Sequence, residues 1–250
     1  MSEKLWHLKN CRLFEQLAPD ELRRIEIRSR ARAFPRGTPI YLPIDDADSV
    51  FLLASGRARI CHVTPDGKQS ILAFIEPGEL FGETAVFDAG KREEYAEAVD
   101  ASTVVMIPRE VIEDLVRRHP EVSVGIVKLV GLRLRRVERR LKNLLFVPSR
   151  QRLVHLLLEL AEQYGKSASQ GVRLGISLSH QELANVIGTT RETVTVLLGQ
   201  MESEGLVRIA RRKLVINDLD RLARSVHREA PPLPRVADRP AAAPRGSTIG

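Results

Sequence analysis

The sequence predicts an α+β fold with an N-terminal antiparallel β-roll, a long dimerisation helix and a C-terminal winged helix-turn-helix. Residues 33–108 hold strand-length apolar runs that Gly, Pro and Asp interrupt about every 8–12 residues, as in a jelly roll or barrel. Apolar residues recur at heptad spacing through residues 127–144, and two helical patterns separated by a glycine follow from residue 179. We expect domains at 1–108, 109–147 and 148–225, then a disordered Pro/Ala/Arg-rich tail at 226–250.

Composition and charge indicate a globular protein that suits a polyanionic partner. Of 250 residues, 43% are hydrophobic and 28% are charged, which is enough to fill a core. Lys and Arg number 39 against 32 Asp and Glu, giving a net charge of +7. No apolar run approaches the roughly 18–20 residues that cross a bilayer, and MSEKLWHLKNC lacks the apolar stretch of a signal peptide. We therefore expect a cytoplasmic protein without membrane association.

Cysteine and histidine usage argues against a metal centre. Cys11 and Cys61 lack CxxC spacing, so we expect two ordinary reduced thiols. An iron–sulfur sensor needs a larger cysteine set. Haem ligation by His7, Cys11, Cys61 or His62 stays open, although Cys61 and His62 are neighbours on an expected strand and point to opposite faces. We expect no metal ligand.

The sequence carries no pattern for catalysis. A metal-dependent oxygenase on a β-roll needs two histidines and a carboxylate, whereas the strand region holds only His62. Neither Gly-x-Ser-x-Gly nor a phosphate-binding loop occurs. We expect no catalytic residues and a protein that is not an enzyme.

Helical patterns occupy the first 30 or so residues and residues 109–146. APDELRRI places Asp20 just ahead of a helical apolar pattern. In the later segment the apolar residues are spaced alternately three and four positions apart, which is the a/d seam of a coiled coil. A helix that packs only on its own domain needs a wider apolar face than a/d positions provide. We therefore expect a parallel homodimer with the seam Val127, Val130, Leu134, Val137, Leu141 and Leu144.

Residues 179–204 fit a helix-turn-helix. Ser179 precedes Glu182 by three residues, a capping box that opens one helix, and Thr189 stands at the same interval from Glu192 at the start of a second. Gly188 makes the turn, and a glycine follows the second helix in a C-cap position. Before this unit we expect an amphipathic helix at PSRQRLVHLLLELAEQYG and then a loop at KSASQG. After it, the segment LVRIARRKLVIND is typical of a β-hairpin, which would be the wing of a winged helix.

The helix-turn-helix explains why Arg191 and Glu192 are adjacent. Neighbours in sequence do not face each other on a helix, so these charges form no intrahelical ion pair. A helix-turn-helix places its first-turn residues against base edges in the major groove. There Arg donates to guanine and a carboxylate accepts from cytosine, each with about 1–3 kcal/mol of discrimination. We expect double-stranded DNA as the partner, with base contacts from Thr190, Arg191, Glu192 and Thr195.

Phosphate contacts are expected near the starts of both helices and at the tip of the wing, where Lys and Arg position a protein without specifying sequence. The candidates are Ser179, His180, Gln181, Thr189, Arg211, Arg212 and Lys213. An alternative of another class is a ligand-sensing module with protein-only contacts, whose binding would be indifferent to duplex DNA and to salt.

Together these segments resemble the catabolite-activator/fumarate-nitrate-regulator (CRP/FNR) family of bacterial transcription factors, over about residues 10–222. PRGTPIYLPIDDADSVFLLASGRARI looks like the first effector-domain strands, PGELFGETAVF like the nucleotide-cassette motif and TTRETV like the start of the recognition helix. The resemblance implies a cyclic-nucleotide-binding-like roll, palindromic TGTGA-like sites and RNA polymerase as a partner. The family often has Arg where Val196 stands, so we expect one guanine contact to be missing, or to be replaced by apolar contact with a thymine methyl.

The resemblance also implies a candidate effector pocket. Cyclic-AMP-responsive members use a Glu at the ribose, an Arg and a Ser at the phosphate, and two hydroxyls of the long helix at the adenine. The matching positions here are Gly82, Glu83 and Thr84, then Arg92 and Glu93, then Val137 and Glu138.

The pocket residues argue against cyclic AMP. Glu93 stands where the cyclic-AMP-responsive members have the phosphate-binding Ser. A carboxylate about 5 Å from the phosphate would reduce the binding free energy by roughly 3 kcal/mol at an effective dielectric constant of about 20. Val137 offers no hydrogen bond to adenine. The alternatives are cyclic di-GMP, another ligand, or none. A purely structural interpretation has Gly82 in a tight turn and Glu83 paired with Arg92.

Overall fold

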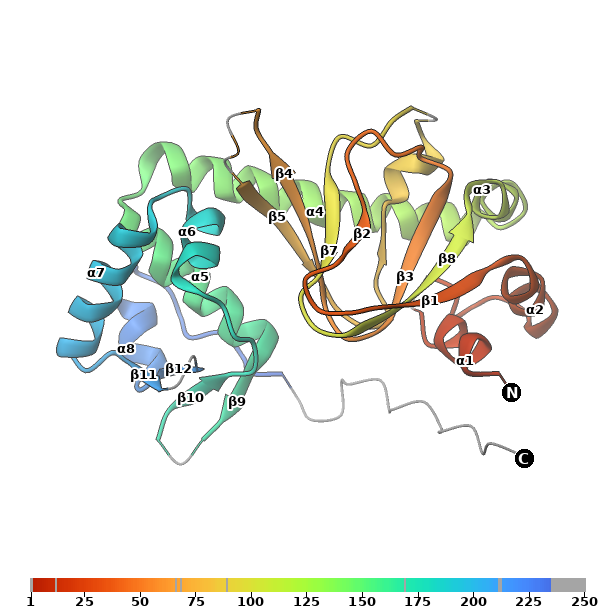
Figure 1. The fold of residues 1–250 in the computed structure, drawn as a ribbon. Helices are drawn as coiled ribbons and strands as arrows, with labels where there is room; N and C mark the ends of the chain where they lie inside the picture. The colour runs from red at the N-terminus through yellow and green to blue at the C-terminus, as the bar shows by residue number, and fades with distance from the viewer. Residues whose placement is uncertain are drawn as a thin grey trace. The chain divides into compact units, whose positions relative to one another are not determined.

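The computed structural model describes residues 2–11, 13–65, 67, 69–88, 90–168, 170–210 and 213–234. It has two compact units, Met1–Arg135 and Arg136–Arg239, with the boundary inside helix α4 (Pro120–Phe146). The first unit is rich in antiparallel strands and the second in short helices, which confirms the predicted α+β class (Figure 1).

The first unit is built on two four-stranded antiparallel sheets, in the orders β1-β8-β3-β6 and β2-β7-β4-β5. Their strands are β1 (Arg30–Phe34), β2 (Pro39–Tyr41), β3 (Ser49–Ser55), β4 (Ala58–Val63), β5 (Gln69–Ile75), β6 (Leu80–Phe81), β7 (Tyr95–Ala98) and β8 (Ser102–Pro108). One buried cluster draws a side chain from every strand: Phe34, Tyr41, Phe51, Ile60, Ile75, Phe81, Ala96 and Val104. The two sheets therefore enclose a common core, as the predicted roll requires.

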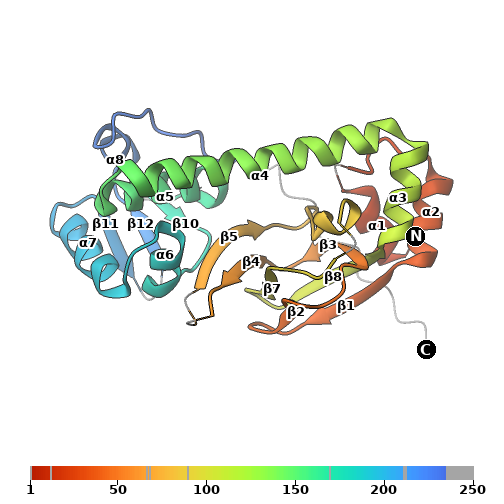
Figure 2. The same ribbon diagram turned by 90° about the horizontal axis from the view of Figure 1, so that it is seen from above.

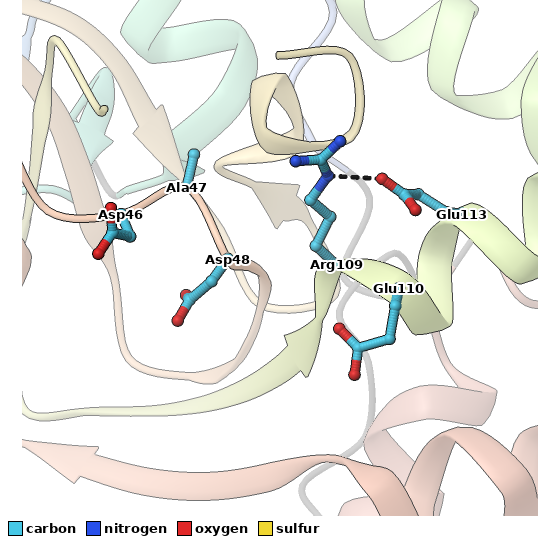
Figure 3. Close-up of a pocket in the computed structure, with 6 residues that line it drawn as sticks. All are labelled: Asp46, Ala47, Asp48, Arg109, Glu110 and Glu113. Atoms are coloured by element: carbon cyan, nitrogen blue, oxygen red, sulfur yellow. Dashed lines mark ion pairs between the residues drawn. The ribbon is translucent and has the colours of Figure 1, made fainter. Parts of the chain in front are cut away.

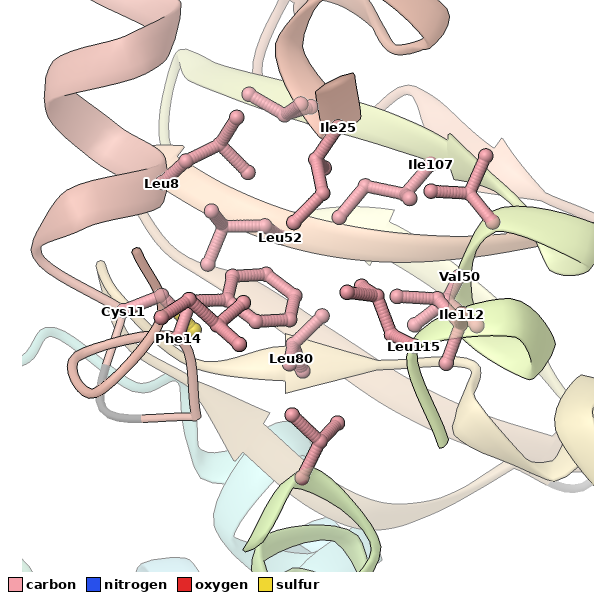
Figure 4. Close-up of a cluster of buried hydrophobic side chains, with 14 of the residues drawn as sticks. Leu8, Cys11, Phe14, Ile25, Val50, Leu52, Leu80, Ile107, Ile112 and Leu115 are labelled. Atoms are coloured by element: carbon pink, nitrogen blue, oxygen red, sulfur yellow. The ribbon is translucent and has the colours of Figure 1, made fainter. Parts of the chain in front are cut away.

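A second core lies on the outer side of the first sheet, under α1 (Glu3–Lys9), α2 (Pro19–Arg28), α3 (Arg109–Arg118) and the start of α4 (Figure 4). Successive residues of a strand face opposite ways. Phe51 and Leu53 of β3 therefore enter the roll, while Val50 and Leu52 enter the helix-covered core. Because both faces are buried, β3 is an almost unbroken apolar run instead of an alternating one.

The helical pattern over 109–146 is divided into α3 and α4, and Figure 2 shows the chain turning between them. Pro120 causes the break, because proline lacks an N–H and disfavours helical geometry in the residue before it, here His119. On α4 the seam side chains are 38–65% exposed, whereas Val122 and Ile126 are buried in the first unit. The seam comprises Val127, Val130, Leu134, Val137, Leu141 and Leu144.

The second unit combines α5 (Ser149–Tyr164), α6 (His180–Ile187), α7 (Arg191–Ser203) and α8 (Leu219–Arg224) with a sheet of order β11-β12-β10-β9. Strands β11 (Val207–Ala210) and β12 (Lys213–Ile216) form the predicted wing hairpin. The prediction of a loop at KSASQG is wrong at its start, because β9 (Gly165–Ser167) pairs with β10 (Val172–Leu174). Pairing with β10, which is not visible in the composition of the segment, makes it a strand.

The ordered part of the chain continues into the segment expected to be a disordered tail. Val226 is buried, and the Arg228 backbone N–H donates to the Ala223 carbonyl. Residues 235–250 of that expected tail lie outside the described residues.

Both cysteines are buried in the first unit and are present as thiols. Burial raises the pKa of Cys11 to about 12, so the reactive thiolate is scarce at neutral pH. We expect neither Cys11 nor Cys61 to react with a disulfide reagent in the native protein at pH 8, and both to react in denaturant. A colorimetric thiol titration checks this, and rapid native labelling of either residue would contradict it.

Candidate nucleic-acid interface and effector pocket

The first helix of the helix-turn-helix begins with the predicted capping box. The Glu182 backbone N–H donates to Ser179 Oγ at 3.2 Å, and the Ser179 backbone N–H donates to Glu182 Oε2 at 2.7 Å. Gly188 ends the helix with a φ of 64°, a left-handed conformation that favours glycine. A Cβ at Gly188 would also lie 2.4 Å from Leu144 Cδ2, so a side chain there would force the Leu144 side chain to shift.

The second helix has a different cap from the one predicted. Thr190, not Thr189, is the N-cap of α7, and its Oγ1 accepts from the Thr193 backbone N–H at 3.2 Å. The box at Thr189 and Glu192 was wrong because the tight turn at Gly188 starts the helix one residue later. Gly205, with a φ of 74°, follows the last helical turn as expected.

The two faces of α7 differ sharply in burial. Val194, Leu198 and Met201 are buried in the second unit. The predicted base-reading residues Thr190, Arg191, Glu192, Thr195 and Val196 are all exposed. These five residues therefore lie on the exposed side of the helix, and their role in base reading stays a prediction.

Glu192 is held in its ionised form. Hydrogen bonds from its own backbone N–H and from the Thr190 hydroxyl lower the pKa of its carboxyl group, and Arg191 lowers it further. A negative charge in the first turn also favours the helix macrodipole. At neutral pH the side chain is an acceptor, which suits the exocyclic amine of cytosine.

A side-chain bridge joins the two helices on their exposed side. His180, the first residue of α6, has Nδ1 2.8 Å from Thr195 Oγ1 on α7. The Thr195 hydroxyl in turn donates to the Arg191 carbonyl at 2.9 Å. The bridge links one candidate phosphate-contacting residue to one candidate base-contacting residue.

Arg152 of α5 fastens the helix-turn-helix to the end of α4. Its Nη1 donates to the carbonyls of Leu144 and Val147, and its Nη2 donates to the Gly188 carbonyl at 3.3 Å. Carbonyls at a helix C-terminus lack intrahelical partners, so a guanidinium is a suitable donor for them. Within the second unit, the turn before α7 is therefore fixed to the last turn of α4.

The candidate phosphate contacts are described only in part. Ser179, Gln181 and Lys213 are exposed, and His180 and Thr189 are half-buried. Arg211 and Arg212 lie outside the described residues.

The ribose-matching residues of the first unit form a buried charged site. Gly82 adopts a φ of 66°, as expected for a tight turn, and precedes the short helix η1 (Glu83–Val86). Glu83 is 5% exposed, and its Oε1 pairs with Arg133 Nη1 from α4. Arg133 Nη2 also donates to the Leu80 carbonyl. Among the described residues Glu83 Oε2 has no hydrogen-bond partner.

The expected pairing of Glu83 with Arg92 was wrong. The Arg92 guanidinium lies over the rings of Tyr41 and Phe51, at 4.3 and 5.0 Å from their centroids, and Nη2 donates to the Ser49 carbonyl at 2.5 Å. These contacts hold Arg92 inside the roll at 5% exposure, while Arg133 supplies the counter-charge to Glu83. Arg92 Nη1 finds no hydrogen-bond partner in the described part of the chain.

The other predicted pocket residues are solvent-facing. Thr84 and Glu93 are exposed on the first unit, so Glu93 does not share the burial of its neighbour Arg92. Val137 and Glu138 are exposed residues of α4 in the second unit.

A hollow of about 440 Å³ occurs elsewhere on the first unit (Figure 3). Its charged lining is mainly acidic, and Arg109 pairs there with Glu113. The lining residues are Asp46, Ala47, Asp48, Arg109, Glu110 and Glu113. None of them belongs to the predicted pocket, and the excess of carboxylates disfavours a phosphate ligand.

Two kinds of feature are absent from the described residues. No group of three or more His, Cys, Asp or Glu side chains in them is arranged to hold a metal ion. None of their helices has the length and apolar character that spanning a membrane requires.

Comparisons with known proteins agree with this architecture. The cyclic nucleotide-binding domain model matches residues 31–119, and the Crp-like helix-turn-helix domain model matches residues 151–225. The cyclic AMP receptor protein of Thermus thermophilus is 35% identical over 202 residues, which cover 81% of this chain and 90% of that protein. The chain belongs to the CRP/FNR family.

Further relatives extend the CRP/FNR match over most of the chain. A CRP-like cAMP-activated global transcriptional regulator of Mycobacterium tuberculosis is 28% identical over 217 residues, covering 87% of this chain and 97% of that protein. A solved CRP-family transcriptional regulator from Thermus thermophilus matches with a TM-score of 0.68 at 27% identity, covering 80% of this chain and 98% of the other. The chain is thus a CRP-family transcriptional regulator with a DNA-binding helix-turn-helix.

One residue of the buried charged site in this CRP/FNR chain was not predicted from the sequence. Arg133 is not among the residues predicted for the pocket, yet it is the ion-pair partner of buried Glu83. A signal was present: Arg133 precedes seam residue Leu134, so it flanks the seam instead of lying opposite it.

Proposed function

We propose that the protein is a cytoplasmic homodimer that binds palindromic TGTGA-like DNA sites and regulates transcription with RNA polymerase, without requiring cyclic AMP. The observation that carries the proposal is the first turn of α7. There Arg191 and ionised Glu192 are exposed side by side on a helix that Gly188, Thr190 and Arg152 fix in place. These side chains suit the guanine and cytosine of one G·C pair, or of two neighbouring pairs.

The exposed seam of α4 supports the homodimer. Leu134 and Leu141 are 56% and 54% exposed, which is unusual for leucines repeated at heptad spacing unless a partner covers them. A two-fold dimer presents two α7 helices, so its preferred site is a palindrome with half-sites about one helical turn apart.

The buried site of the first unit supports independence from cyclic AMP. Arg133 already neutralises Glu83, and Arg92 already bonds the Ser49 carbonyl and stacks on two rings. A nucleotide would have to compete with these internal partners. Val137 lacks a hydrogen-bonding group for adenine, so this residue does not fit that ligand.

A ligand-switched regulator is the second candidate. Glu83 Oε2 and Arg92 Nη1 are buried polar atoms without hydrogen-bond partners among the described residues, and such atoms favour a ligand with a donor and an anionic group. The Thermus thermophilus relative carries the name cyclic AMP receptor protein. Cyclic AMP and cyclic di-GMP are the ligands to test.

A selection from a random duplex pool tests the proposal, run without ligand and with cyclic AMP, cyclic GMP or cyclic di-GMP. We expect the same palindrome in every arm. Enrichment in a single arm would support the ligand-switched regulator and name its ligand. No enrichment in any arm, with no salt-dependent DNA affinity, would favour the protein-only module.

Single substitutions separate base reading from phosphate contact. Glu192→Ala should remove about 1–3 kcal/mol of discrimination at one base pair, roughly 5- to 150-fold, because no acceptor remains for cytosine. Lys213→Ala should weaken binding to all duplexes alike and reduce its salt dependence. Titrations against the selected site and its single-base variants measure both, and the reverse pattern would overturn these roles.

Because the pKa of Glu192 is lowered, the preference of the wild-type protein for the selected base pair should persist from about pH 8 to about pH 5.5.

A further inference from the structure

We propose that Thr195 recognises a thymine in each half-site through its methyl group, and that His180 is the positioning residue that enforces this. The inference rests on the proposed mode of DNA binding and adds a specificity determinant to it. Its basis is the state of the Thr195 hydroxyl, whose proton and one of whose two lone pairs have hydrogen-bond partners inside the protein.

The direction of each hydrogen bond follows from the chemistry of the groups. A carbonyl only accepts, so the single hydroxyl proton of Thr195 is given to the Arg191 carbonyl, 2.9 Å away. Thr195 Oγ1 must then accept at its other contact, where His180 Nδ1 lies 2.8 Å away. The His180 ring is therefore protonated on Nδ1.

This arrangement leaves the hydroxyl without a proton for a base. Reading adenine N7 or a thymine carbonyl through Thr195 Oγ1 would require breaking its bond to Arg191 and forfeiting an internal hydrogen bond. The methyl carbon Cγ2 is the branch of the exposed side chain that needs no polar partner. An exposed threonine methyl in the major groove complements the C5-methyl of thymine.

The neighbouring residue strengthens the inference. Val196 follows Thr195 on the exposed side of α7 and is itself 58% exposed. The recognition surface thus combines a charged part, Arg191 and Glu192, with an apolar part, Thr195 and Val196. A site read by this surface should place thymines beside the G·C step, one facing each apolar side chain.

Replacing thymine by deoxyuridine tests the inference without altering the protein. Deoxyuridine pairs as thymine does and lacks only the C5-methyl group. In the selected palindrome, single replacements at two thymines per half-site should each weaken binding by about fourfold, the value of one buried methyl-sized group. Full affinity for every such replacement would overturn the inference.

Two substitutions then assign one of those thymines to Thr195. Thr195→Ser keeps the hydroxyl and both hydrogen bonds, so it should abolish the thymine-over-uracil preference at one position and retain it at the position facing Val196. Thr195→Val keeps a methyl branch and removes the hydroxyl. It should retain the preference and weaken binding to all duplexes, because His180 loses its acceptor.

In the opposite result, the thymine-over-uracil preference survives in Thr195→Ser and is lost in Thr195→Val. That result would mean that Thr195 contacts the base through its hydroxyl group. That outcome would overturn the inference while leaving the proposed function intact, since both variants are measured on a site already selected by the wild-type protein. If no duplex is selected at all, the proposed function itself fails, which is a distinguishable result. Circular dichroism of both variants confirms that the helices remain folded.

Discussion

Leu134→Glu is expected to convert the protein from a dimer to a monomer in sedimentation. Leu134 is 56% exposed in the isolated chain and lies mid-way along the heptad seam of α4. In a parallel dimer the substitution would bury two glutamates against each other without counter-charges, and an unpaired buried charge costs about 3–5 kcal/mol. Dimerisation should weaken by about 150- to 5,000-fold, and affinity for the palindrome should fall with it.

Leu132→Glu is the matched control for this substitution. Leu132 is also about half exposed and lies on the same helix, at the heptad position furthest from the seam. The same change of charge there should leave the dimer intact. A dimer that survives Leu134→Glu, or is lost equally in both variants, would refute the seam.

Arg133→Met is expected to destabilise the first unit by about 3 kcal/mol. The substitution retains the apolar stem of the side chain and removes the charge that neutralises Glu83, whose side chain is 7% exposed. Leaving a buried carboxylate without its partner lowers the free energy of unfolding by more than the intact ion pair contributes to it. Urea unfolding followed by fluorescence of Trp6, the single tryptophan of the sequence, reports on this unit.

Two further variants show whether the loss of stability in Arg133→Met arises from the unpaired charge of Glu83. Glu83→Gln combined with Arg133→Met removes both charges and should recover most of the lost stability. Arg135→Met changes an exposed arginine two residues along α4 and should cost less than about 0.5 kcal/mol. Equal losses in Arg133→Met and Arg135→Met would mean that the Glu83 pair is not the cause.

Sequence alone was most informative where structure depends on neighbours along the chain. The capping box at Ser179, the left-handed turn at Gly188 and the exposed positions of Arg191 and Glu192 are local features, set by backbone sterics and helix periodicity. Short apolar runs bounded by turn or polar residues predicted the roll and the wing hairpin. Two of the errors concerned only a few residues: the helix start moved by one residue, and the first residues of an expected loop joined a sheet.

The tertiary structure decided which distant side chains meet. Glu83 pairs with an arginine 50 residues away instead of with the nearer Arg92, which the rings of Tyr41 and Phe51 hold. His180 and Thr195 meet across two helices, and that contact determines which atoms of Thr195 have internal hydrogen-bond partners. No periodicity encodes such contacts, because they depend on how whole elements pack. The sequence therefore determined the elements and the exposed face of α7, and the packing determined the partners of the buried charges Glu83 and Arg92.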